Sequence, residues 1–228
     1  MILWAISETS ASAEERFLLS TATPPRFLVE NRGEMLDYYE ALLVDNPSLD
    51  YQELEALEME MPILPRLMMT EPAFTPNYMH EGLVYVSGAL RAAMSLPDDA
   101  VDYRPVDLTK CCESARAKAY MTLEVVHSAE PFDREQSDGV WVDAVGRDGR
   151  SSRRWELIGG GPNDPTPRIV FSGEFVPPAP LFRALGTGWL MATDDLAQRV
   201  MHAGISDVMF IKRDGERGRT EMVCKTLS

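Results

Sequence analysis

The second half of this chain is divided into short apolar runs by turn residues, and this pattern constrains the fold more than any other feature. The runs with the composition of strands are 101–106, 119–126, 140–145, 153–158 and 169–175, with further pieces around Trp189 and Met209. Turn sequences such as Asp138-Gly139 and Asp214-Gly215 lie between them. Strands joined in this way, with a few helices beside them, predict an α+β fold with a mixed, largely antiparallel sheet.

The first half combines two strand candidates with two helix candidates. Residues 1–6 and 26–30 are short and extended in character, whereas apolar residues recur at helical spacing over 35–43 and again over 54–61. Four prolines between 62 and 76 exclude a regular helix there. This stretch indicates a seam between an acidic N-terminal region, residues 1–76, and an α+β domain, residues 77–228; the alternative is one continuous domain.

Two further helices are expected from their capping residues. The strand candidate 83–86 ends at Ser87, whose hydroxyl suits the start of a helix that carries Leu90, Ala93 and Met94 inward. Thr193 is placed in the same way before a helix that ends near Gly204, a residue typical of helix ends.

The charge balance narrows the classes of partner. The 36 acidic residues outnumber the 22 basic ones, which gives a formal net charge of −14. Such a surface repels nucleic acids and anionic membranes and attracts basic surfaces. The three cysteines, Cys111, Cys112 and Cys224, do not form a disulfide framework. With neither a signal peptide nor a membrane span in the sequence, we expect a reduced, cytoplasmic protein.

Motifs for catalysis, metals and cofactors are weak. Cys111 and Cys112 lack the gap that lets two thiolates bind one zinc ion, so a buried or partly buried thiol pair is expected. The three histidines are His80, His127 and His202, and none has a nearby second ligand or a nucleophile motif. The glycine clusters 159–161 and 186–188 resemble turns more than phosphate loops. We therefore expect no enzyme activity, no catalytic residue, no metal and no cofactor.

Acidic residues are concentrated between Gly33 and Pro65, where no Lys or Arg occurs. They are Glu34, Asp37, Glu40, Asp45, Asp50, Glu53, Glu55, Glu58 and Glu60. Such a run is either the solvated face of two helices or an electronegative patch for a basic partner, and interleaved tyrosines favour the second interpretation. The residues expected to bind a partner are Asp37, Tyr38, Glu40, Tyr51, Glu53, Glu55 and Glu58.

An ordered series of segments runs through residues 80–211. It comprises 82–87, 101–106, Tyr120 with 123–126, Asp133 with Ser137, 180–183, 192–196, and 203–210. In order and spacing this series resembles the bacterial polymorphic-toxin immunity proteins of family eleven. The family has a glycine before its final Val-x-Phe, where this chain has Ser206-Asp207.

The resemblance implies an antitoxin that binds a cognate toxin or secreted effector with a basic surface and occludes its active site. It gives no oligomeric state. Arg183 is expected to form an ion pair with Asp133 inside the fold. Two other functions remain open: a hydrolase with a carboxylate-based site, indicated by a deep pocket with His80 or His127 beside two carboxylates, and an adaptor or chaperone that delivers an effector without inhibiting it.

Overall fold

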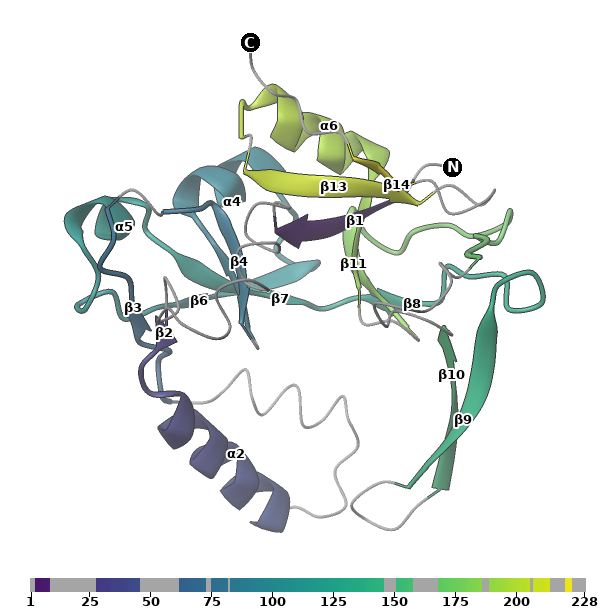
Figure 1. Ribbon diagram of the computed structural model, residues 1–228, viewed down its shortest axis with the longest axis horizontal. Coiled ribbons are helices and arrows are strands. Elements are labelled where there is room, and N and C mark those ends of the chain that lie inside the picture. The colour runs from purple at the N-terminus through teal and green to yellow at the C-terminus, as the bar shows by residue number, and fades with distance from the viewer. Residues whose placement is uncertain are drawn as a thin grey trace.

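The computed structural model shows an α+β fold, as the sequence predicts, with sheets that are mostly antiparallel (Figure 1). It describes residues 3–8, 28–45, 62–72, 75–81, 83–145, 151–157, 168–185, 189–205, 207–213 and 220–222. Within these ranges, none of the helices is long and apolar enough to cross a membrane.

A six-stranded sheet joins the N-terminal strand to strands from the last third of the chain. Its order is β14 (Thr220–Met222), β13 (Val208–Arg213), β1 (Leu3–Glu8), β12 (Leu190–Thr193), β11 (Leu181–Ala184) and β8 (Ser128–Ala129). All neighbours are antiparallel except β11 and β8, which are parallel. A domain boundary at residue 76 would therefore separate β1 from both strands with which it pairs.

A four-stranded antiparallel sheet lies beside it. Its order is β4 (Tyr78–Glu81), β5 (Leu83–Val86), β7 (Met121–Val125) and β6 (Val101–Pro105). The pair β2 (Leu28–Val29) and β3 (Leu67–Met68) adjoins it, because the Leu67 amide donates to the Asp107 carbonyl at 3.0 Å. A separate ribbon, β9 (Gly139–Val145) and β10 (Ser151–Leu157), pairs along seven residues of each strand.

A side-chain cap fixes the start of the helix that follows β5. The helix α4 (Gly88–Met94) begins where the sequence predicts, since the Leu90 amide donates to the Ser87 hydroxyl at 3.1 Å. The helix α6 (Asp194–His202) also follows its predicted cap, Thr193, although that side chain makes no capping hydrogen bond. The helix α2 (Arg32–Asp45) covers the predicted segment 35–43, and α5 (Glu113–Ala117) was not expected from the sequence.

Alternating side chains place both large sheets between hydrophobic layers. Val84 and Val86 enter a first core with α4, α6 and one face of the six-stranded sheet, whereas Tyr85 faces a second core beneath β2, β3 and α5. On the other face of the six-stranded sheet, Phe182 and Met191 enter a third core. Successive side chains of a strand lie on opposite faces of the sheet, and a shift of one residue would move each of them to the wrong face. The burial of these side chains therefore fixes the registers of the strands.

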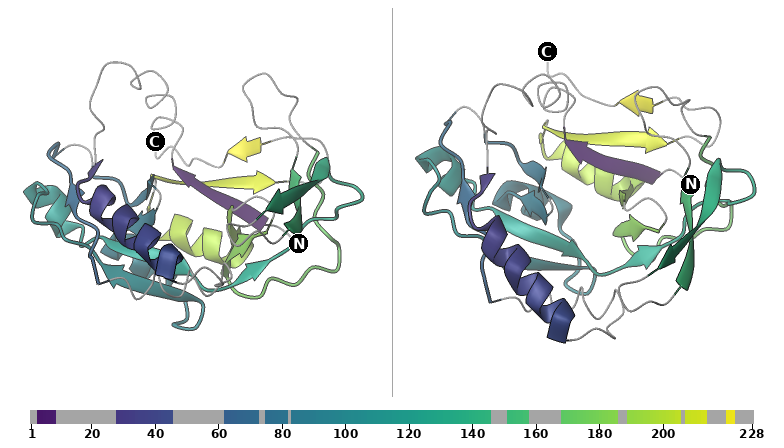
Figure 2. Two further views of the ribbon diagram at one scale, coloured as in Figure 1. Left: turned by 90° about the horizontal axis from the view of Figure 1, so that it is seen from below. Right: turned by 60° about the horizontal axis from the view of Figure 1, so that its bottom comes forward.

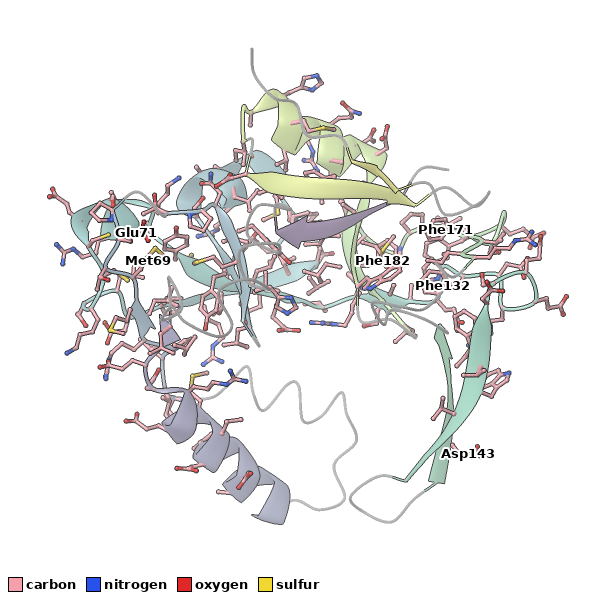
Figure 3. The ribbon with its side chains drawn as sticks, viewed as in Figure 1. Met69, Glu71, Phe132, Asp143, Phe171 and Phe182 are labelled. Atoms are coloured by element: carbon pink, nitrogen blue, oxygen red, sulfur yellow. The ribbon has the colours of Figure 1, made fainter. Side chains whose placement is uncertain are left out.

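The third core is aromatic and carries the β9–β10 ribbon. Phe132 lies 5.9 Å from Trp155 of β10 and 5.8 Å from Phe171, measured between ring centroids. Figure 3 shows Phe132, Phe171 and Phe182 gathered at this end of the molecule, with Asp143 farther out along β9. Buried aromatic side chains thus fix the base of a ribbon whose far end projects.

Several expected elements differ from those in the structure. The predicted strand 169–175 is not a strand; its only pairing is a single bridge between Phe171 and Phe132, because its apolar side chains pack on the aromatic core. The expected strand 26–30 is two residues long. The predicted helix over 54–61 lies outside the described residues.

Candidate partner-binding surface

The helix α2 projects from the sheets at one end of the molecule, and the β9–β10 ribbon projects in the same direction at the other (Figures 1 and 2). The start of α2 is fixed by Asn31, which is 5% exposed. Its side-chain amide donates to the Leu64 carbonyl at 2.8 Å, and its carbonyl accepts from the Arg66 amide at 2.8 Å. The Met35 amide then donates to the Asn31 carbonyl, which continues the chain into the helix.

An ion-pair network holds the same junction to the four-stranded sheet. Arg66 donates to Asp107 at 2.9 Å and to Glu30 at 3.3 Å. Hydrogen bonding to Arg66, together with the amide and hydroxyl of Thr109, lowers the pKa of Asp107 to about 2. The base of α2 therefore has a defined attachment, and the helix extends from it.

Acidic side chains lie on the exposed surface of α2. Glu34, Asp37 and Glu40 are all exposed, and their spacing of three residues places them along one side of the helix. Like charges at this spacing repel and reduce helix stability. The arrangement is therefore one that a partner of opposite charge would relieve.

The rest of the described part of α2 is only partly packed. Met35 reaches the second core, Tyr38 is half-buried, and Leu36 is 51% exposed. Of the residues expected to bind a partner, the structure thus places Asp37, Tyr38 and Glu40 on one projecting helix. The other four, Tyr51, Glu53, Glu55 and Glu58, lie outside the described residues.

The ribbon carries an aromatic surface that the sequence analysis did not single out. Trp141 is 46% exposed and Val140 is 45% exposed. The guanidinium of Arg134 lies 4.7 Å from the centroid of the Trp141 ring, and Arg134 itself forms an ion pair with Glu130. The signal in the sequence is the uninterrupted apolar run 140–142. A two-stranded ribbon with one buried face needs apolar residues only at alternate positions, so this run leaves an apolar side chain on the exposed face.

Arg183 pairs with a different carboxylate from the one expected. Its guanidinium donates to Glu124 of β7 at 3.2 Å, and both side chains are about three-quarters buried. Asp133 instead accepts from the amides of Glu135 and Gln136 at 3.0 and 3.1 Å, which closes a local turn. The expected pairing of Arg183 with Asp133 is therefore corrected: β11 pairs with β8, the strand that follows β7 in the chain, and Arg183 lies opposite Ser128, four residues after Glu124.

A polar network joins the two large sheets near the start of β13. The amide and the side-chain NH₂ of Asn77 donate to Asp207 at 2.6 and 2.8 Å, and its carbonyl oxygen Oδ1 accepts from Ser87 and Lys118 at 2.6 and 3.1 Å. Ser87 is fully buried. The Ser87 hydroxyl is thus committed to structural hydrogen bonds, and no substrate has access to it.

Cys111 and Cys112 are a buried and a partly buried thiol, as the sequence predicts, and Cys224 lies outside the described residues. Cys111 is buried and donates to the Leu67 carbonyl at 3.2 Å, and burial raises the pKa of its thiol. Cys112 is half-buried beside the Ser114 hydroxyl, and that hydrogen bond lowers the pKa of its thiol. Among the described residues, no three His, Cys, Asp or Glu side chains converge as a metal site would require.

No protein-family model matches this chain, and no curated protein matches it. Its functional interpretation therefore depends on its own residues. The features that bear most directly on it are the exposed carboxylates of α2 and the exposed tryptophan of β9.

Proposed function

We propose that this chain is an immunity protein that binds a basic toxin or secreted effector and occludes its active site. The observation that carries the proposal is the row of exposed carboxylates, Glu34, Asp37 and Glu40, on a helix that projects from the body of the protein. The net charge of −14 supports it, since the whole molecule attracts a basic partner.

The charges and the aromatic surface have different parts in this mechanism. An enzyme that handles phosphates needs a basic cleft, and the carboxylates of α2 would occupy such a cleft in place of phosphate groups. Charge attraction mainly raises the association rate, whereas buried aromatic anchors slow dissociation. Among the residues that the structure describes, Trp141 is the exposed aromatic side chain best suited to this second part, because the guanidinium of Arg134 lies against its ring.

The affinity that the proposal requires is high. A lethal enzyme is neutralised only when very little of it stays free, so we expect at least nanomolar binding, about −12 kcal/mol. The test is to co-express the chain with the product of the adjacent gene, purify the pair and titrate its components. Micromolar or absent binding would contradict the proposal.

Toxin activity separates inhibition from delivery. An immunity protein abolishes the activity of its bound toxin at a one-to-one ratio, with residual activity that follows the free fraction. A complex that forms tightly and leaves the activity unchanged would instead identify an adaptor or chaperone. Both outcomes are read from one activity titration of the toxin against the chain.

A further inference from the structure

A groove lies along α6, at the end of the molecule opposite to α2 (Figure 1). It is an open groove of about 760 Å³. One wall is the segment Pro177–Pro180, and the other is the outer side of α6 with Thr193. The Thr193 amide donates to the Pro180 carbonyl at 2.9 Å, which holds the two walls together at their base.

The helical wall is a polar stripe that follows from the amphipathic sequence of α6. Leu196, Ala197 and Val200 are fully buried in the first core. The residues on the opposite side recur at helical spacing and line the groove. They are Asp195, Gln198, Arg199 and His202.

The oppositely charged side chains in this stripe do not pair with each other. Asp195 and Arg199 are one helical turn apart, a spacing at which such residues often pair, yet no ion pair joins them. Arg199 makes one long hydrogen bond, 3.4 Å to the Ser95 carbonyl. Within the described part of the chain, the side chains of Asp195 and His202 make no hydrogen bond or ion pair.

The proline wall is apolar and conformationally restricted. Each proline ring fixes its own backbone angle, so little entropy is lost when a ligand packs against the segment. Val176, which is 80% exposed, directly precedes the first proline of this wall. A ligand that fits both walls therefore needs charged groups on one side and an apolar group on the other.

We infer that the groove binds an extended peptide segment in which a basic, an apolar and an acidic residue follow one another. Alternate side chains of an extended chain lie about 6.8 Å apart on one side. This distance is close to the rise of about 5.4 Å over the helical turn that separates Asp195 from Arg199. The basic side chain then meets Asp195, the acidic one meets Arg199 and His202, and the apolar residue between them points to the prolines.

The probe is the peptide acetyl-Lys-Leu-Glu-amide, titrated into ¹⁵N-labelled protein and followed by NMR. We expect amide shifts confined to Ala179 and 193–203, with a dissociation constant on the order of 1 mM because the contact is small. Peptides with two lysines, with two glutamates, or with glycine in place of leucine should each bind at least about fivefold more weakly.

Variants of the protein complete the test. D195N and R199Q should each weaken binding of the probe at least about fivefold, whereas D98N, an exposed acid outside the groove, should leave it unchanged. Shifts elsewhere in the protein, equal shifts with all four peptides, or binding that survives both groove substitutions would overturn the inference. The site is separate from α2, so its failure would leave the proposed toxin binding untouched.

Discussion

Removing the Ser87 hydroxyl is expected to destabilise the protein by about 2 kcal/mol. The side chain is fully buried and makes two hydrogen bonds, one from the Leu90 amide at 3.1 Å and one to Asn77 at 2.6 Å. Loss of an N-cap costs about 1 kcal/mol. Loss of the hydrogen bond to Asn77 adds about 1 kcal/mol. For a chain of this size, the sum corresponds to a fall in Tm of roughly 4–8 °C.

The measurement is urea unfolding of S87A, followed by tryptophan fluorescence and far-UV circular dichroism. The matched control is S95A at the other end of the same helix, where the side chain is exposed and the change should be within about 0.5 kcal/mol. If S87A costs no more than S95A, the hydroxyl does not cap α4, and the network around Asn77 does not stabilise the fold as described.

Three further predictions concern the ribbon, the acid response and the backbone. G139A should destabilise the protein by about 1–3 kcal/mol and alter its tryptophan fluorescence, because the new methyl group would lie 2.1 Å from the Trp155 ring; G173A, where the space is open, is the control. The pKa of Asp107 is about 2 in the fold, below its unfolded value of 3.8, so its contribution to stability is full above about pH 5 and is lost as the pH falls towards 2. D107N should make acid unfolding less steep there, and an unchanged slope would contradict this. A119G should raise the free energy of unfolding by about 1 kcal/mol, because Ala119 has a φ of +50°, and thermal unfolding that shows no gain would be inconsistent with that strain.

Local features of the fold are predictable from the sequence because their causes are local. The end of β5 and the start of α4 are set by Ser87, a neighbour of both. The apolar opening of the chain forms β1 as expected. The place of β1 between β12 and β13 is not predictable in this way, since it depends on contacts with residues almost two hundred positions away.

The features that the sequence does not predict correctly also depend on distant contacts. Ile169 and Phe175 lie in a sequence typical of a strand, but their side chains pack in the aromatic core. The segment is not a strand because of where that core lies, which the sequence does not show. The sequence offers many carboxylates as partners for Arg183, and its pairing with Glu124 depends on the contact between β11 and β8, the strand that follows β7. The exposure of Trp141 is not predictable from the sequence, because the sequence of a strand does not show whether its second face is covered.

The central claim is that the carboxylates of α2 draw a basic partner to this protein. The direct measurement is the association rate of the purified pair by stopped flow, at low and high salt, for D37K/E40K and for D98K/D99K, which changes the net charge equally at exposed positions elsewhere. The account predicts at least about tenfold slower association and a weaker salt dependence for D37K/E40K than for D98K/D99K. Equal rates for the two variants would contradict it.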